Sequence, residues 1–565
     1  MPDYRKIDTD ILIIGGGGAA ALAALSAMGA GCGVTTVSKE TSLLGGASIE
    51  AGGGINILND PEDSPEKFYE DIIQGGAGLN NRRIAMTLAE RSRKALLNME
   101  KYGVLLDKVG DDFRKVYRTE GSRYARGYVD RRENLGWCHG LTAALARSDL
   151  HFYPETYVTR LLFGREQVAG ALGISLATGE YLVFQAKAVL LATGGLGQLY
   201  EVTSNSRTLT GDGYAMAWDA GARLVDMEMV QFLPLCFPFP RSRRGIAIGM
   251  SSLFGPNVKL YNGLGERYMH RYDPERAEYT TRDIAARGNY TEISEGRGTE
   301  RGAIVVDPTG NDRSLLPNYR DTHPFIYGRV RDVFGVPAQN WEATFEAMPA
   351  QHHFMGGVLI DEECRTDVPG LFAVGEVSGG VQGGNRLGGN GLGEIIVFGD
   401  IAGESIARGI KGKKTAPLDS AEIEREIGEL EAAFQASPAD GIRPFRVKEN
   451  IQKAMWNYLG PVRSKDGMEK AVSALEEIEK DDLPRVSPGY RQREFNREWM
   501  EAVEVKKMLR TALLVVHAAL SREESRGSHY RTDFPQADDE NWLVNTVAGK
   551  SREGEITIDF KPAGA

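Results

Sequence analysis

The sequence has 565 residues, and its 68 glycines make up roughly 12% of the chain, against about 7% in an ordinary protein. Hydrophobic residues account for 42% and charged residues for 26%, which excludes a disordered or collagen-like chain. The length predicts roughly three or four domains. The net charge of −11 offers no general attraction to nucleic acid, so we expect no nucleic-acid partner.

The cysteine spacing and the hydropathy indicate the redox compartment of the protein and its relation to membranes. The four cysteines contain no C-x-x-C pair, which predicts neither a metal site nor a disulfide framework and favours a reducing, cytoplasmic compartment. The chain starts without the pattern of a signal peptide, and no apolar run reaches the roughly 18 residues of a membrane span. We therefore expect no direct membrane insertion.

The first forty residues predict a dinucleotide-binding βαβ unit. An apolar strand at Ile11–Ile14 runs into a glycine-rich turn at 15–20, an alanine-rich helix and a second strand at Val34–Val37. The turn reads G-x-G-x-x-A, in which glycine lets the backbone approach a pyrophosphate at the helix N-terminus. A purely structural turn is the alternative, but the order of the elements favours the nucleotide. Ser38 or Glu40, at the end of the second strand, could contact a ribose.

Further glycine clusters lie along the chain. The cluster at 45–54 would bring backbone amides close to a flat ligand, with a flexible loop as the alternative. Buried strands are predicted to end at Ala192–Gly195 and at Gly375–Glu376, and a helix follows Thr210–Gly213. Long insertions separate these signals. They predict an α/β fold in which a Rossmann-like domain is interrupted by another domain.

The remaining patterns predict the domain order. The segment from Pro65 to about Tyr102 reads as helical, as do Ala421–Ala436 and Arg497–Leu520. The last fifty residues, rich in Asp, Glu and Arg, are expected to form an exposed tail with few packing anchors. We predict the nucleotide-binding domain over 1–230 and 351–411, the inserted domain over 231–350, and a C-terminal helical domain and tail over 412–565.

This order of motifs resembles the flavoprotein subunit of the succinate dehydrogenase and fumarate reductase family, which includes L-aspartate oxidase. The resemblance covers nearly the whole chain. The matching pieces are Ile14–Ala20, Ser38–Lys39, Ala192–Gly195, Thr210–Gly213, Asp226–Phe232, Gly375–Glu376, Asn385–Asn390, Ser521–Arg531 and Asp538–Trp542.

The resemblance implies FAD in the Rossmann-like domain, with the inserted domain closing over the flavin as a cap. It places Glu376 at the ribityl chain of the flavin and Asp212 near the ribose and adenine. The cofactor-binding residues that it implies are Gly15, Gly17, Gly18, Ala19, Ala20, Ser38, Lys39, Gly45, Gly46, Ala47, Ser48, Gly52, Gly53, Gly54, Ala192, Thr193, Gly194, Asp212, Gly375, Glu376, Arg386, Gly389 and Leu392.

The flavin-facing loop departs from the covalent members of the family. In those members a histidine in the loop after the second strand attaches the flavin, whereas Leu44–Gly53 contains no histidine. We therefore predict non-covalent FAD. In the family, loss of the linkage lowers the potential of the flavin, which favours reduction of a double bond over oxidation of succinate.

The resemblance also implies three catalytic residues. Arg386 falls on the arginine that binds the substrate carboxylate, where a planar guanidinium can bind two oxygens. His352 falls on the substrate histidine, and Arg282 on the arginine that donates the proton. The chemistry is hydride transfer from the flavin to an alkene carbon with proton delivery to its neighbour. The structural alternatives are an ion pair of Arg282 with Asp283 or Asp273 and a core pair of His352 with His353.

The sequence departs from the family where the second substrate carboxylate is bound. After Gln231-Phe232 the family has His-Pro-Thr, but this chain has Leu233–Leu235, and Met250-Ser251 and Phe254 replace Thr-Glu and an arginine. A carboxylate buried among such side chains would lack partners. We expect the far end of the substrate to be apolar or aromatic. In the family, the replaced glutamate and arginine also relay protons to the catalytic arginine. Candidate substitutes for this proton relay are Arg241, Arg243, Arg244 and Arg287.

These features predict an FAD-dependent oxidoreductase that acts on CH–CH groups. It would reduce the C=C bond of an α,β-unsaturated carboxylate that need not be fumarate. The chain has no haem motif, cysteine cluster or second nucleotide fold, so we expect a partner iron–sulfur subunit to supply the electrons. The alternatives are an FAD electron-transfer subunit of a larger redox complex, and oxidation of the succinate dehydrogenase or L-aspartate oxidase type.

Overall fold

The computed structural model describes residues 3–51, 54–110, 112–113, 116–119, 121–130, 132, 135–437 and 440–564. Gly52 and Gly53, two of the predicted cofactor-binding glycines, lie outside the described residues. No helix in the described ranges combines the length and the apolar character needed to cross a membrane.

A five-stranded parallel sheet forms the centre of the chain and confirms the α/β class. Its strands, in spatial order, are β21 (Leu371–Ala373), β13 (Ala188–Leu191), β2 (Ile11–Ile14), β3 (Val34–Val37) and β9 (His151–Tyr153). Every residue of β2, β3 and β13 is buried, as expected for a parallel sheet covered on both faces. The strands β2 and β3 have the bounds that the apolar runs predict.

Two helices pack against each other beside this sheet with very little space between their backbones. They are α1 (Gly18–Gly29) and α11 (Asn390–Ile410). A Cβ atom at Gly403 of α11 would lie 2.4 Å from the carbonyl oxygen of Ala23 in α1. Glycine and alanine therefore set how closely the two helices approach. The contact fixes the N-terminus of α1 beside the start of α11.

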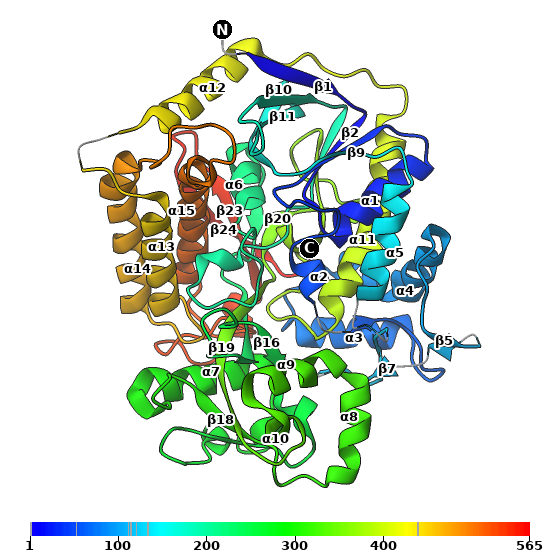
Figure 1. Ribbon diagram of the computed structural model, residues 1–565, viewed down its shortest axis with the longest axis vertical. Coiled ribbons are helices and arrows are strands. Elements are labelled where there is room, and N and C mark those ends of the chain that lie inside the picture. The colour runs from blue at the N-terminus through cyan, green and yellow to red at the C-terminus, as the bar shows by residue number, and fades with distance from the viewer. Residues whose placement is uncertain are drawn as a thin grey trace.

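A second sheet has four strands and carries two of the C-terminal helices. Its order is β1 (Tyr4–Asp8), β12 (Tyr181–Gln185), β11 (Gln167–Ser175) and β10 (Thr156–Gly164). Helices α12 (Ser420–Gln435) and α15 (Arg497–Ser521) pack on it through a core that includes Ile427 and Trp499. These helices match the predicted segments to within one residue at each end. Helices α13 (Pro444–Tyr458) and α14 (Lys465–Glu477) lie beside α15 (Figure 1).

The segment from Pro65 to Tyr102 is helical but not continuous. It forms α3 (Pro65–Gly75), α4 (Arg82–Asn98) and a 3₁₀ turn at Met99–Tyr102. Ala77 and Gly78, between the two helices, have φ values of 52° and 80°, which an α-helix cannot contain. The shorter elements of this region and its surroundings are α2 (Ala47–Glu50), β4 (Ile55–Asn56), β5 (Lys108–Val109), β6 (Asp112–Phe113), β7 (Val116–Tyr117), β8 (Gly127–Tyr128), α5 (Leu135–Ala146) and α6 (Asp212–Asp219).

The inserted segment forms a cap with a core of its own, drawn in green in Figure 1. Its sheet has the order β16 (Ala247–Gly249), β15 (Val230–Cys236), β19 (Phe345–Phe354), β18 (Ile304–Asp307) and β17 (Lys259–Tyr261). The cap helices are α7 (Arg282–Glu292), α8 (Leu316–Thr322), α9 (Pro324–Phe334) and α10 (Val336–Gln339). The chain enters the cap along β15 and leaves it along β19, and these two strands pair antiparallel.

The prediction of an exposed C-terminal tail is wrong. Strands β23 (Val544–Lys550) and β24 (Ile556–Pro562) extend a sheet with β22 (Ser378–Gly379), β20 (Gly357–Leu359) and β14 (Leu224–Val225). Ahead of them, α16 (Asp539–Trp542) follows a segment that contains fully buried Arg522. Arg522 donates to Glu228 at 2.7 Å and to Glu524 at 2.8 Å. Some of the charges that suggested a solvated tail thus form a buried ion network with Glu228, just before the cap begins.

Arg522→Ala should strongly destabilise the protein, because it leaves Glu228 buried without its pairing cation, whereas Glu524 keeps its ion pair with Arg526. We expect a loss of about 3–5 kcal/mol, which is typical when one partner of a buried ion pair is removed. Thermal and urea unfolding would measure the loss. Exposed Arg552 provides the matched control, and Arg552→Ala should change stability by less than about 0.5 kcal/mol. Equal unfolding midpoints for the two variants would contradict the structural role of the network.

Candidate active site

A long cavity opens at the carboxyl ends of the central parallel strands, where ligands bind in open α/β sheets. Its wall collects most of the predicted cofactor-binding residues: Gly15, Gly17, Gly18, Ala19, Ser38, Lys39, Gly45, Gly46, Ala47, Ser48, Ala192, Thr193, Gly194, Asp212, Gly375, Glu376, Arg386 and Leu392. Three described members of the predicted set, Ala20, Gly54 and Gly389, do not line it. Ala20 is buried within α1, where it packs in the core.

The turn between β2 and α1 can be built only from glycine at its first position. Gly15 has φ +126°, and a Cβ atom there would lie 2.1 Å from the carbonyl oxygen of Ala192. A Cβ atom at Gly16 would lie 2.7 Å from the hydroxyl of Ser38. The backbone therefore forms an open cradle at the N-terminus of α1, where helix amides favour a phosphate. The hydroxyl of Ser48, in the short helix α2, accepts from the Gly18 amide at 3.0 Å.

A buried ion cluster forms one end of the cavity. The Lys39 ammonium donates to Asp212 at 2.6 Å and to Glu504 at 2.8 Å, and the hydroxyl of Tyr157 donates to Asp212 at 2.8 Å. Burial alone would raise the pKa of Asp212, but the positive charges of Lys39 and Lys507 outweigh it and lower that pKa. Asp212 is therefore a charged acceptor suited to ribose hydroxyls.

Glu504 and Lys507 escaped the sequence reasoning although both support this cluster from α15. Each is at least nine-tenths buried. Burial lowers the pKa of Lys507 to about 8, and its ammonium donates to the carbonyl of Val158 at 3.0 Å. The two residues stand at i and i+3 of α15, but Glu501, Lys506 and Arg510 lie in the same stretch, so the sequence holds no signal that singles them out.

Glu376 lies on the wall at the end of β21. Its Oε1 accepts from the backbone amide of Phe354 at 3.0 Å, and burial raises its pKa to about 7. A Cβ atom at Gly195 would lie 2.3 Å from the same carboxylate oxygen. This glycine thus leaves room for the carboxylate to face the cavity. The backbone carbonyl of Glu376 accepts a hydrogen bond from the hydroxyl of Tyr214.

The predicted catalytic residues come together where the cap meets the nucleotide-binding domain. Arg386 and His352 both line the cavity. The amide of Gln231 accepts from Arg386 at 3.1 Å and donates to Asn385 at 2.6 Å, which holds the guanidinium in place. Arg282, the first residue of α7, is not on the wall, but its charge acts on His352.

A β-bulge brings two consecutive histidines to the cavity. In the β15–β19 ladder Gln231 lies opposite His353 and Phe232 opposite Gln351, so His352 has no residue opposite it. Without this irregularity, adjacent side chains would point to opposite faces. The surrounding protein and the charges of Arg386 and Arg282 lower the pKa of His352 well below its ordinary value. His352 is therefore neutral near pH 7. The suggested core pair of histidines does not account for this placement.

Residues aligned with the family's second-carboxylate pocket lie in apolar cores. Leu235 and Phe254 belong to the core of the cap, and Leu233 packs with Cys236 and Met348. Among the described residues of the predicted inserted segment, Ala247 is the one on the cavity wall. Two of the arginines suggested as relays are engaged elsewhere: Arg244 pairs with Glu201 at 3.0 Å, and Arg287 stacks on Tyr530.

Comparison with known proteins shows strong similarity over the whole chain. The family described as "FAD binding domain" matches residues 10–392, and "Fumarate reductase flavoprotein C-term" matches residues 448–564. The chain is 39% identical to one of the subunits of the fumarate reductase (CoM/CoB) from Methanothermobacter marburgensis, covering 97% of this chain and 98% of that protein. It is 30% identical to the fumarate reductase flavoprotein subunit of Mycobacterium tuberculosis, covering 98% and 97%.

Solved structures are also similar to this chain. A mutated FrdA chain of E. coli quinol fumarate reductase has a TM-score of 0.89 at 26% identity, covering 100% of this chain and 98% of that chain. The glycine cradle, the acceptor Asp212 and the elongated cavity fit the pyrophosphate, ribose and flat ring of FAD. FAD is thus the cofactor of this chain.

Gly15→Ala should abolish FAD binding, because the added methyl group would collide with the Ala192 carbonyl and the residue would keep a strained positive φ. The ratio of FAD to protein after purification, and titration of the apoprotein with FAD, measure the effect. Gly29→Ala at the far end of α1 is the control, since a Cβ atom there meets nothing within 4 Å. Normal FAD content in the Gly15→Ala protein would refute the cradle.

Proposed function

The chain belongs to the flavoprotein subunits of the fumarate reductase and succinate dehydrogenase family, which are FAD-dependent oxidoreductases acting on CH–CH groups, and from this we propose that it reduces the C=C bond of an α,β-unsaturated carboxylate. The observation that carries the proposal is that Arg386 and a neutral His352 lie together on the cavity wall, where the charge of Arg282 also acts on His352. Bound FAD supplies the hydride.

The protein's own residues bind and protonate the substrate. Arg386, held by Gln231, offers a planar guanidinium to one carboxylate and orients the alkene. Negative charge grows on this carboxylate and its α-carbon as the hydride arrives at the β-carbon, and the guanidinium stabilises that charge. Arg282 gives a proton to the α-carbon, which completes the saturated product. Because His352 is neutral, it adds a hydrogen bond without a charge.

We further propose a substrate with one carboxylate and an apolar far end. Among the described lining residues, the side chains with a permanent positive charge are Lys39 and Arg386, and Lys39 is paired with Asp212. A second carboxylate would therefore lack a dedicated cation on the wall. The contribution of Ala247 from the cap favours an apolar group there.

The electron source is proposed to be a separate iron–sulfur subunit. The relatives named above are themselves described as subunits. In the described residues no cluster of His, Cys, Asp or Glu could hold a metal ion. The four cysteines are free, which supports a reducing, cytoplasmic location for the assembly.

The substrate proposal is tested with reduced viologen as the electron donor. We expect the holoenzyme to oxidise the dye on addition of a short enoate or a cinnamate-like monocarboxylate, and to prefer it to fumarate by kcat/KM. Preference for fumarate would refute the apolar far end. Flavin reduction by aspartate or succinate, with no enoate turnover, would establish oxidation instead. Flavin reduction by a co-purifying iron–sulfur protein alone would establish an electron-transfer subunit.

The same assay tests the proton donor. Arg282→Ala should lower turnover by about 10²–10⁴-fold, the usual contribution of a positioned acid, while FAD stays bound. Arg287→Ala is the control, since this arginine lies on the same helix but stacks on Tyr530. Full activity of the Arg282→Ala enzyme would eliminate its role.

Non-covalent attachment has its own test. Because Leu44–Gly53 contains no histidine, acid precipitation should release all of the FAD into the supernatant. Absorbance of the supernatant and of the redissolved pellet measures the partition. Yellow colour that stays with the pellet would overturn the proposal.

A further inference from the structure

A short segment of the nucleotide-binding domain forms backbone hydrogen bonds with strand β19 near its end. We call Glu201–Asn205 the strap. Thr203 forms a parallel bridge with Gln351, the amide of Gln351 donates to Val202 at 2.9 Å, and the amide of Ser204 donates to the Gln351 carbonyl at 2.9 Å. The two hydrogen bonds of this bridge thus fix the strap beside the bulge that carries His352.

Two side chains of the strap bind His352 directly. The hydroxyl of Ser204 lies 2.8 Å from Nδ1 of the imidazole, and the Asn205 amide donates to the backbone carbonyl of His352 at 2.8 Å. Ser204, Asn205 and His352 all line the cavity. One ring nitrogen is therefore held by the protein, and the other is the one available to a ligand.

The direction of the Ser204 hydrogen bond follows from its surroundings. The hydroxyl has a single proton. Its other acceptor is the Gln351 carbonyl at 3.2 Å, which already accepts the Ser204 amide, whereas Nδ1 is closer at 2.8 Å. A neutral imidazole carries one proton, and burial together with the positive charges of Arg386 and Arg282 lowers the pKa of this ring and keeps it neutral. If Nδ1 accepts from Ser204, the ring proton is on Nε2.

We propose that Ser204 is a positioning residue that fixes His352 in its Nε2–H tautomer, so that the histidine meets the substrate as a hydrogen-bond donor. The proposal deepens the proposed function and rests on it for the identity of the substrate. In this tautomer Nε2 has no lone pair for a proton. The group placed at His352 must therefore be an acceptor oxygen of a carboxylate or a carbonyl, and an ammonium group has no partner there.

Nitrogen NMR of the holoenzyme tests the tautomer without reference to activity. The protein is labelled with ¹⁵N at its eight histidines, and the His352 signals are assigned by their absence in His352→Asn. We expect Nδ1 of His352 to show the downfield shift of an unprotonated nitrogen and Nε2 the shift of an N–H nitrogen. A proton on Nδ1 in the wild-type protein would overturn the proposal.

Variants separate positioning from simple structural support. Ser204→Ala should mix the two tautomers and lower kcat/KM for an enoate by about tenfold, the value of one hydrogen bond to a charged group. Ser204→Thr keeps the hydroxyl and should restore both the signals and the activity. Ser405→Ala removes another buried serine, in α11 and off the cavity wall, and should change neither.

The outcomes for this inference and for the proposed function are distinct. Unchanged His352 signals in Ser204→Ala, with FAD bound, would overturn the role of Ser204. The expected tautomer together with no turnover of any enoate would leave the Ser204 assignment supported and would refute the proposed function.

Discussion

The antiparallel pairing of β15 with β19 is the interaction on which the active site depends. These strands carry the chain into and out of the cap, and their ladder sets Gln231 opposite His353. From this register the Gln231 amide reaches Arg386, and the bulge at His352 turns that ring to the cavity. A slip of one residue would reverse every side chain on a strand, so the register itself fixes which groups can meet a substrate.

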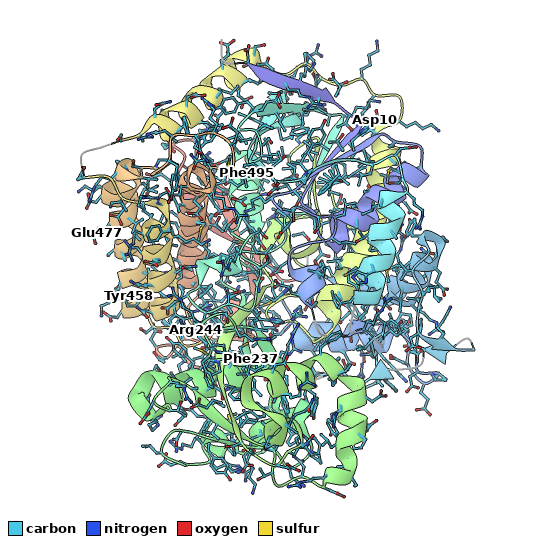
Figure 2. The ribbon with its side chains drawn as sticks, viewed as in Figure 1. Asp10, Phe237, Arg244, Tyr458, Glu477 and Phe495 are labelled. Carbon is cyan, nitrogen blue, oxygen red and sulfur yellow. The ribbon has the colours of Figure 1, made fainter. Side chains whose placement is uncertain are left out.

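Segments distant in sequence keep this ladder in place. The strap hydrogen-bonds to Gln351 of β19, and the Arg522 network includes Glu228, two residues before β15 begins. The cap touches the strap again through Arg244, which pairs with Glu201 and lies where the cap meets the rest of the molecule in Figure 2. Cap, nucleotide-binding domain and C-terminal segment therefore all make contacts close to this ladder, through the exposed pair Arg244–Glu201 and through the buried pair Arg522–Glu228.

The sequence predicted those features of the fold that depend on only a few neighbouring residues. The glycines of the first turn and the strands around them follow from steric rules within a few residues, and the cradle at Gly15 lies where the pattern places it. The C-terminal tail was mispredicted because burial of Arg522 depends on Glu228, 294 residues away. Ser204 and Glu504 were missed for the same reason. Leu235 and Phe254 aligned with a substrate pocket, but alignment alone cannot say that their side chains face the core of the cap.

The Lys39–Glu504 ion pair gives the cofactor site a thermodynamic link to the far end of the chain. Lys39 is on the wall of the FAD cavity, whereas Glu504 belongs to α15, against which α13 and α14 pack. Linkage is reciprocal: whatever free energy FAD gains from an ordered α15, the ordering of α15 gains from FAD. Loading of the cofactor and ordering of the C-terminal helices are thus coupled equilibria, so that loss of FAD also weakens helices that do not line its cavity.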